Sequence, residues 1–260
     1  ELISKINSRR DKYDVCATAS AYMGHEALYS KILEYEAVVL CDLPASIRNK
    51  ILKFCYDQNK RTYITPKISD IILNGTESIH LFDTPLMLSR NQGLTIEQRF
   101  VKRTMDIIFA LLAIVISSPF LLIIALAIKL YDGGPVFYKQ ERLTRDRETF
   151  QIIKFRSMKV DSEKQGAQLA KKDDDRITPV GRIIRMTHLD ELPQIFNILK
   201  GEMSFVGPRP ERQEIAEKYE EVVPEFRFRL KVKAGLTGYA QVYGKYNTTP
   251  YDKLKLDLTY

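Results

Sequence analysis

An apolar run, IIFALLAIVISSPFLLIIALAI, extends from Ile107 to Ile128 and contains no charged residue. As an α-helix that rises about 1.5 Å per residue, it is long enough to cross a hydrocarbon core of about 30 Å. The alternative is a helix buried inside a soluble protein, which the length and purity of this run disfavour. The pattern therefore predicts a membrane segment, which we place at residues 105–130.

Two features argue against a simple membrane span. Pro119 removes a backbone hydrogen bond near the middle and kinks the helix, and nearby Ser hydroxyls such as that of Ser118 can bond the freed carbonyls. Lys and Arg residues flank both ends, and such residues stay on the cytoplasmic side of a membrane. Each half, about eleven residues or roughly 16 Å, reaches only midway into the core. We therefore predict a re-entrant helix–break–helix, with the break at Ser118 and Pro119.

The region upstream alternates strand-like and helix-like patterns. EAVVLCDLP is typical of a buried strand, ASIRNKILKFCYDQ of an amphipathic helix, and RTYITP of another short strand. This βαβ order indicates part of a doubly wound, Rossmann- or flavodoxin-like domain over residues 1–90. No GxGxxG follows these strands, so a structural or regulatory role is favoured over nucleotide binding. Residues 91–104 are predicted to be a linker.

Downstream of the apolar run the chain is basic and rich in turns. We predict a mainly helical α+β domain over residues 131–260, and an α/β fold class for the chain as a whole. Arg156 stands between apolar residues in IIKFRSM, where a charge needs a fixed anionic partner. KKDDDR, residues 171–176, is more typical of a solvated charged loop than of a metal site, although three adjacent Asp residues could hold a hard cation.

Composition narrows the classes of function. The 260 residues carry a formal net charge of +7, which favours an anionic partner: nucleic acid, an acidic membrane face or a phosphorylated substrate. Nucleic acid is disfavoured, because the basic residues gather around the membrane segment and no recognition motif is present. The three cysteines lack CxxC spacing, which fits a reducing compartment and excludes a Cys-rich zinc site.

The stretch THLDELPQ places Asp190 and Glu191 side by side before Pro193. Ordinary helix starts use such residues, so a purely structural role is the first alternative. Proline is tolerated in the first turn of a helix, which predicts that both carboxylates lie at a helix N-terminus. Free N–H groups and the helix dipole would lower their pKa values there, which suits a nucleophile or a metal ligand.

Two further clusters could bind a ligand. In GPRPE, rigid prolines flank Arg209, whose planar guanidinium could bind phosphate in bidentate fashion; a turn with a surface arginine is equally consistent. In AGLTGYAQVYG, glycines at 235, 238 and 244 would allow a close backbone approach to a ligand, although a bare turn would also use them.

Together these stretches resemble the monotopic phosphoglycosyl transferases of the bacterial sugar transferase family, from about Arg99 to Tyr260. The matching segments are the SSP-broken apolar helix, GGPVFYKQERL, FQIIKFRSM, LDELPQIFNILKGEMSFVGPRPE and AGLTGYAQVYGKYN. One departure is His188, where the family often has Ser beside the dyad. Larger members carry a similar N-terminal domain, transmembrane helices upstream of it, and a segment after LDLTY. The chain is therefore expected to be a fragment of such an enzyme.

The resemblance implies transfer of a hexose-1-phosphate from a UDP-sugar to undecaprenyl phosphate, with release of UMP, at the start of exopolysaccharide or O-antigen synthesis. By analogy with large members, UDP-glucose and UDP-galactose are the expected donors. The expected location is the cytoplasmic face of the bacterial inner membrane. The resemblance leaves open whether the chain forms a homo-oligomer. The alternative from another class is a non-catalytic, membrane-anchored assembly or regulatory module of a polysaccharide export system.

The resemblance also assigns residues. Asp190 matches the nucleophile that forms a covalent phosphosugar intermediate, and Glu191 matches the acid that helps to hold Mg²⁺ on the diphosphate. The expected phosphate-binding residues are Arg156, Arg209 and Arg185, and the expected nucleotide or rim residues are Gly238 and Gln241.

Overall fold

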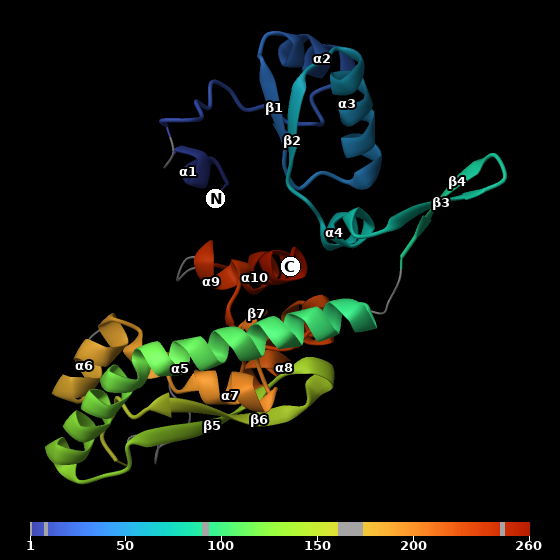
Figure 1. Cartoon of the computed structure of the whole chain (residues 1–260). Coiled ribbons are helices and arrows are strands. Elements are labelled where there is room, and N and C mark those ends of the chain that lie inside the picture. The colour runs from blue at the N-terminus through green and yellow to red at the C-terminus, as the bar shows by residue number, and fades with distance from the viewer. Residues whose placement is uncertain (1, 8–9, 90–93, 161–173, 245–247) are drawn as a thin grey trace. The chain divides into compact units, whose positions relative to one another are not determined.

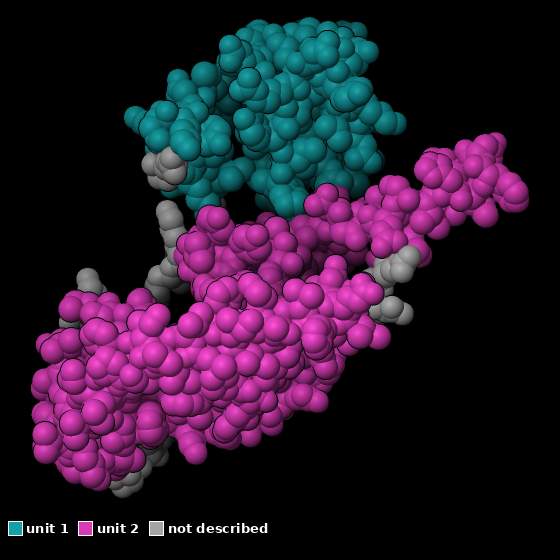
Figure 2. Space-filling view, in the orientation of Figure 1, with its two compact units in different colours: residues 1–67 teal, residues 68–260 magenta. Residues whose placement is uncertain are grey.

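The computed structural model describes residues 2–7, 10–89, 94–160, 174–244 and 248–260. The chain divides into two compact units, residues 1–67 and 68–260, which Figure 2 distinguishes by colour. The sequence placed the end of the N-terminal domain at residue 90 instead. Ile68 lies in a buried cluster with Val223, Phe226 and Leu254, so the helix that it begins packs with the second unit.

The first unit contains the expected strand, helix and strand. Its elements are α1 (Leu2–Asn7), α2 (His25–Leu33), β1 (Ala37–Leu40), α3 (Ala45–Asp57) and β2 (Arg61–Ile64). β1 pairs with β2 in parallel, with α3 as the connection (Figure 1). A small apolar core forms where Leu28 and Ile32 of α2 meet Leu40, Ile51 and Cys55. The βαβ pattern is therefore present, as a two-stranded sheet in the described residues.

The second unit begins with α4 (Ile68–Asn74) and an antiparallel hairpin of β3 (Glu77–Leu81) and β4 (Thr84–Leu88). The long helix α5 (Ile96–Asp132) follows. α5 begins well before the predicted membrane segment, because Thr95 and Gln98 form a capping box at its start. Part of the predicted linker is thus helical.

Within α5, Pro119 lies inside a continuous helix, and the ribbon changes direction part-way along its length (Figure 1). Because proline has no N–H, the carbonyl of Val115 loses its usual helical partner. The Ser118 hydroxyl donates a hydrogen bond to this carbonyl at 2.9 Å. The serine beside the proline therefore repairs the backbone, as the sequence suggested, while the helix bends rather than ends.

The apolar side chains of α5 are largely exposed. Only 17% of its most apolar eighteen-residue window is buried, and Val115 and Ile116 are each 72% exposed. A core helix of a soluble protein would bury most of this surface. The exposed apolar face is instead typical of a membrane-interacting helix. α5 is the one helix among the described residues with the length and composition to cross a membrane.

The rest of the second unit mixes short helices with two small sheets. The elements that follow α5 are β5 (Phe137–Leu143), η1 (Arg145–Arg147), β6 (Thr149–Phe155), α6 (Pro179–Met186), η2 (Leu189–Glu191), α7 (Gln194–Lys200), β7 (Ser204–Val206), α8 (Gln213–Val222), η3 (Pro224–Lys231), β8 (Gly235–Thr237), α9 (Tyr239–Val242) and α10 (Pro250–Leu258). β5 pairs with β6 in antiparallel fashion, and β7 pairs with β8 in parallel. The whole is a mixed helix and strand fold attached to one long apolar helix.

The start of α5 is tied to the elements that follow it. Arg103 donates hydrogen bonds to the carbonyls of Ile198 and Leu199 at the end of α7, each at 2.6 Å. Asp106 is buried and accepts hydrogen bonds from the Ser204 hydroxyl and the Phe205 N–H. Arg103, one of the basic residues that precede the apolar run, thus serves internal contacts.

Candidate active site

The two adjacent acids lie in the short 3-10 turn η2. His188, in the left-handed region at φ 58°, lets the chain reverse between α6 and this turn. Leu189 and Leu192 pack against a buried cluster formed by Ile124, Ile128, Phe155 and Ile184. The two leucines anchor the turn and leave both acids partly accessible.

The predicted helix position of the acids needs correction. α7 begins only at Gln194, and Pro193 is its N-cap, so Asp190 and Glu191 precede the helix rather than form its first turn. The bond from the Glu191 N–H goes to the His188 carbonyl within η2. Free N–H groups of a helix end therefore do not explain their ionisation.

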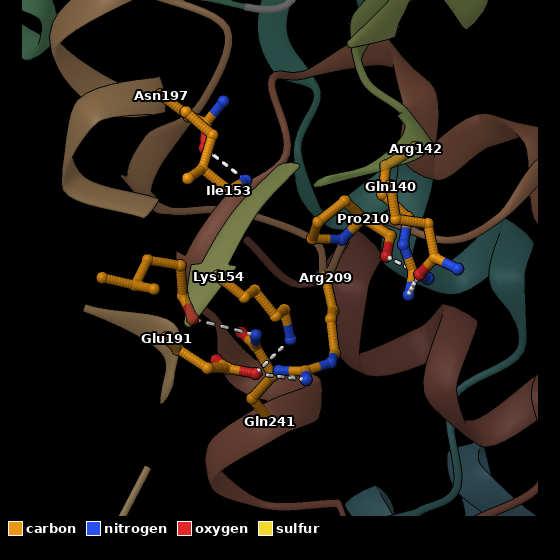
Figure 3. Close-up of polar contacts among 10 residues, drawn as sticks. Gln140, Arg142, Ile153, Lys154, Glu191, Asn197, Arg209, Pro210 and Gln241 are labelled. Atoms are coloured by element: carbon orange, nitrogen blue, oxygen red, sulfur yellow. Dashed lines mark hydrogen bonds and ion pairs between the residues drawn. The ribbon is translucent and has the colours of Figure 1, made fainter. Parts of the chain in front are cut away.

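Glu191 is the centre of a three-residue charge cluster (Figure 3). Its Oε1 atom lies 2.7 Å from Lys154 Nζ and 2.8 Å from Arg209 Nη2. Burial alone would raise the pKa of Glu191, but the two cations outweigh burial and bring the pKa down to about 2. Glu191 is therefore ionised throughout the neutral range.

Asp190 has the opposite environment. Burial raises the pKa of its carboxyl; the charge of Lys154 opposes this shift, and the negative charge of Glu191 adds to it. The charge of Arg185, in the last turn of α6, also lowers this pKa, which places Arg185 among the groups near Asp190. The expectation of a lowered Asp190 pKa is wrong, because desolvation dominates over any helix-end effect.

Lys154 was missed at the level of sequence. It lies in β6, and burial lowers its pKa against the attraction of Glu191. The reasoning applied to Arg156 also holds for Lys154, because both stand in the apolar stretch IIKFRSM. A charge embedded between apolar residues was the available signal.

Arg156 has a fixed anionic partner, as expected, but that partner is Asp132 at the end of α5. Its Nη1 donates to Asp132 Oδ2 at 2.7 Å, its Nη2 donates to Asp132 Oδ1, and its Nε donates to the Pro135 carbonyl at 2.7 Å. These contacts occupy the guanidinium and tie β6 to the loop after α5. The phosphate role of Arg156 stays a prediction without support from these contacts.

Arg209 reaches the dyad, and its predicted phosphate-binding role stays a prediction. Its guanidinium contacts Glu191, and its carbonyl accepts a hydrogen bond from Arg229 Nη2 at 2.9 Å. Its side chain is 43% exposed, so one face is open to a ligand. The structure therefore brings Asp190, Glu191, Arg185 and Arg209 into one region, together with Lys154.

The glycines near Gly238 serve a contact within the protein. A Cβ on Gly238 would lie 2.3 Å from the Gly207 carbonyl oxygen, and a Cβ on Gly235 would lie 2.1 Å from the Gly207 nitrogen. Close approach is needed here between two backbone segments of the protein, and the nucleotide or rim role of Gly238 stays a prediction. Because Gly207 precedes Arg209 by two residues, this packing also positions the arginine.

Gln241 lies beside Arg209 and Glu191 (Figure 3). Its Nε2 donates to the Leu236 carbonyl at 3.0 Å, while its buried Oε1 has no hydrogen-bond partner among the described residues. Gln241 is thus at the edge of the cluster, and its nucleotide role stays a prediction.

Two places in the chain offer carboxylates to a metal ion. Among the described residues no group of three His, Cys, Asp or Glu side chains could hold a metal. Mg²⁺ commonly binds through one or two carboxylates together with water and substrate phosphates, which the ionised Glu191 and its neighbour can offer. Of the charged loop at 171–176, residues 171–173 lie outside the described residues, and Asp174 pairs with Arg176 at 2.6 Å.

Comparison with known proteins places these residues in a family context. The family model described as bacterial sugar transferase matches residues 97–260. The chain is 46% identical over 147 residues to the UDP-N-acetylgalactosamine-undecaprenyl-phosphate N-acetylgalactosaminephosphotransferase of Aeromonas hydrophila, covering 56% of this chain and 35% of that protein.

Two other relatives have related names. The chain is 42% identical over 172 residues to the UDP-glucose:undecaprenyl-phosphate glucose-1-phosphate transferase of Escherichia coli, covering 66% of this chain and 35% of that protein. It is 37% identical over 206 residues to the undecaprenyl-phosphate galactose phosphotransferase of Salmonella typhimurium, covering 73% of this chain and 42% of that protein. The chain thus spans well under half the length of these three relatives.

Proposed function

Because the chain belongs to the bacterial sugar transferase family, we propose that it transfers a hexose-1-phosphate from a UDP-sugar to undecaprenyl phosphate and releases UMP. The observation that carries this proposal is the Lys154–Glu191–Arg209 cluster beside Asp190. A diphosphate needs cations that neutralise its charge, and a carboxylate nucleophile next to them can attack phosphorus. The three relatives named above carry different sugars in their names, so the proposal covers UDP-hexoses as a class.

In the proposed reaction an oxygen of the Asp190 carboxylate attacks the phosphorus that bears the sugar. The new bond joins this oxygen to phosphorus, while the bond from phosphorus to the bridging oxygen of the diphosphate breaks and UMP leaves with the electron pair. A phosphate oxygen of the polyprenyl acceptor then attacks the same phosphorus and releases the Asp190 carboxylate. Two easier steps replace one difficult transfer.

The opposite pKa shifts of the two acids support separate roles. A carboxylate with a raised pKa is more basic, and hence a stronger nucleophile once it is ionised, which suits Asp190. A carboxylate with a pKa near 2 is a poor base but a permanent anion, which suits an electrostatic role for Glu191. Lys154 and Arg209 hold Glu191 in place and leave positive charge near the reacting phosphates.

Magnesium belongs to the proposal as a cofactor. Glu191, with Asp190 nearby, would hold the ion, and the bound ion would supply positive charge to the diphosphate. The Oε1 atom of Glu191 already contacts two cations, Lys154 and Arg209. The protein therefore offers one ionised carboxylate group and leaves the other ligand positions to water and phosphate.

The proposed arrangement at the membrane rests on α5. The bent, exposed apolar part of α5 would dip into one leaflet of the inner membrane and return, with both ends on the cytoplasmic face. Arg156 and Asp132 join the end of this helix to β6, which carries Lys154. The site would then lie near the headgroup plane, where the acceptor phosphate is found.

The experiment that tests the function is an assay of UMP release from a panel of UDP-sugars by the full chain in a membrane preparation with undecaprenyl phosphate. Asp190→Asn should lower the rate on the order of 10³-fold or more, because the amide cannot form the covalent intermediate. The same variant should unfold at an equal or higher temperature, because the raised pKa of Asp190 means that its ionised form is costly in the folded state.

Asp146→Asn, at an exposed acid, is the matched control. Unchanged UMP release in Asp190→Asn would exclude Asp190 as the nucleophile, and no release by the unaltered chain would favour a non-catalytic module.

A further inference from the structure

A small cavity adjoins the charge cluster of the proposed active site. Its volume is about 20 Å³, and its polar lining comes from Arg142, Lys154, Gln194 and Arg209. This is room for one water-sized group. Neither Arg142 nor Gln194 was predicted from the sequence to be a site residue, and neither contacts Glu191 in the described hydrogen bonds.

Two donors at this cavity have no acceptor. Gln194 is only 2% exposed, and its Nε2 has no hydrogen-bond partner among the described residues. The buried Nε of Arg142 has none either. A buried donor without an acceptor costs free energy, so such a pair indicates a ligand that supplies acceptor oxygens.

The charges around the cavity also favour a ligand with acceptor oxygens. Lys154 and Arg209 share a single oxygen of Glu191. Arg142 forms no ion pair with any described residue; its Nη1 and Nη2 donate to the Pro210 carbonyl at 3.3 Å and to Gln140 Oε1 at 2.7 Å (Figure 3). Burial lowers the pKa of Arg142, and the charge of Glu211 opposes this shift. The charged side chains that line the cavity are all cationic, and this lining favours an anion over a neutral hydroxyl and excludes a metal ion from the cavity itself.

We propose that Arg142 and Gln194 form an anion pocket that binds a phosphoryl oxygen of a substrate. The assignment of that oxygen to a substrate rests on the proposed function. Within that reaction, the oxygen belongs to the diphosphate of the donor or to the phosphate of the acceptor. Arg142 and Gln194 then bind this oxygen inside the cavity, which they line together with Lys154 and Arg209.

Gln194→Glu is the most informative change. It keeps the shape of the side chain and places a negative charge among the surplus cations, so the carboxylate would take the place of the bound anion. Affinity for inorganic phosphate should fall at least about tenfold. The thermal unfolding temperature without ligand should stay equal or rise, because the new charge is paired.

A second variant and a control complete the test. Gln194→Met removes the donor without adding charge and breaks no described hydrogen bond; it should also weaken phosphate binding without loss of stability. Gln213→Glu introduces the same charge on an exposed residue of α8 and should leave binding unchanged. Binding is measured by calorimetry on the full chain in lipid nanodiscs without metal, with inorganic phosphate, UDP and undecaprenyl phosphate as separate probes.

Each outcome either supports or overturns the proposed anion pocket. If Gln194→Glu weakens binding of phosphate and UDP, the pocket serves the donor; if it weakens binding of phosphate and undecaprenyl phosphate only, the pocket serves the acceptor. Equal affinity of the unaltered chain and both Gln194 variants for all three probes would show a pocket that holds only water and would overturn the proposal. So would absence of phosphate binding to the unaltered chain, or loss of binding that always accompanies loss of stability. Gln194-dependent phosphate binding in a chain that releases no UMP would defeat the proposed function and leave the anion pocket intact.

Discussion

Asp190 and Glu191 are neighbours in η2, yet their surroundings shift their pKa values in opposite directions. Both are buried to a similar degree, so burial alone does not separate them. The difference comes from direct contact: Lys154 and Arg209 both touch Glu191, whereas Asp190 has no described ion pair within 4 Å. Two adjacent acids whose pKa values are driven apart are suited to different tasks, here a nucleophile and a permanent anion.

The lowered pKa of Glu191 predicts a specific acid sensitivity. Its pKa falls from an ordinary value near 4.5 to about 2 in the folded chain, so the stability it contributes is present above pH 4.5 and is lost as the pH falls towards 2. The contribution is up to about 3 kcal/mol. Glu191→Gln should therefore flatten the dependence of the free energy of unfolding on pH in this window.

Chemical denaturation in detergent between pH 5 and pH 2 measures this effect. Glu214→Gln, at an exposed acid of α8, provides the control and should keep the slope of the unaltered chain. An identical slope in Glu191→Gln would mean that Lys154 and Arg209 do not stabilise the ionised carboxylate.

At the scale of secondary structure, α5 contacts several of the elements that surround the site. Near its start, Arg103 and Asp106 bind α7 and the β7 segment. At its end, Asp132 binds Arg156 of the segment after β6. Because β6 also carries Lys154, the membrane helix and the charge cluster share one strand as a support.

The Asp132–Arg156 pair should matter for stability. Arg156 is 7% exposed, so Asp132→Asn would leave a buried guanidinium without its counter-charge. Asp132→Asn should therefore lower the free energy of unfolding by more than the loss of an exposed ion pair does. Asp146→Asn removes the acid of the exposed Arg145–Asp146 pair and should cost less than about 1 kcal/mol. Thermal unfolding of both variants in the same detergent gives the comparison, and equal small losses would contradict an anchoring role for Arg156.

For the molecule as a whole, the family match begins at residue 97 and covers α5 and the elements that follow it. These elements build their own apolar cores, and the exposed apolar surface is concentrated on α5. The first unit has a separate core around Leu28, Ile51 and Cys55 and lies outside the match. The proposed membrane attachment of the described residues therefore lies in the second unit, at α5.

A re-entrant α5 predicts that both of its ends face the cytoplasm. Ile96 and Leu130 are each 83% exposed near the two ends, and either can be replaced by cysteine in a chain whose Cys16 and Cys41 are changed to serine. A water-soluble thiol reagent should label both positions from the cytoplasmic side of the membrane and neither from the other side.

Ile116→Cys is the matched control for this labelling. Ile116 is 72% exposed in the protein, so only lipid would protect a cysteine there. Labelling of the two ends from opposite sides would show a full span, and ready labelling at position 116 would show that α5 is not embedded in lipid.

Local patterns in the sequence were sufficient for much of the fold. β1, α3 and β2 lie where the apolar run, the helical spacing and the short strand pattern predicted them, although β1 is largely exposed rather than buried. The apolar run with its SSP break corresponds to a bent part of α5. The repair of the Val115 carbonyl by Ser118 was also predictable, because both residues lie within one helical turn. Such features depend on near neighbours in the chain, and near neighbours are what a sequence pattern contains.

The site required the tertiary structure. The order of residues alone shows that Asp190 and Glu191 adjoin, that Arg209 lies between two prolines, and that Arg156 needs an acidic partner. Only the fold decided that this acid is Asp132, that Lys154 joins Glu191, and that burial raises rather than lowers the pKa of Asp190. The physical reason is that burial and ion pairing depend on groups brought together from distant parts of the chain, and their balance of desolvation and attraction exists only once those groups are in contact.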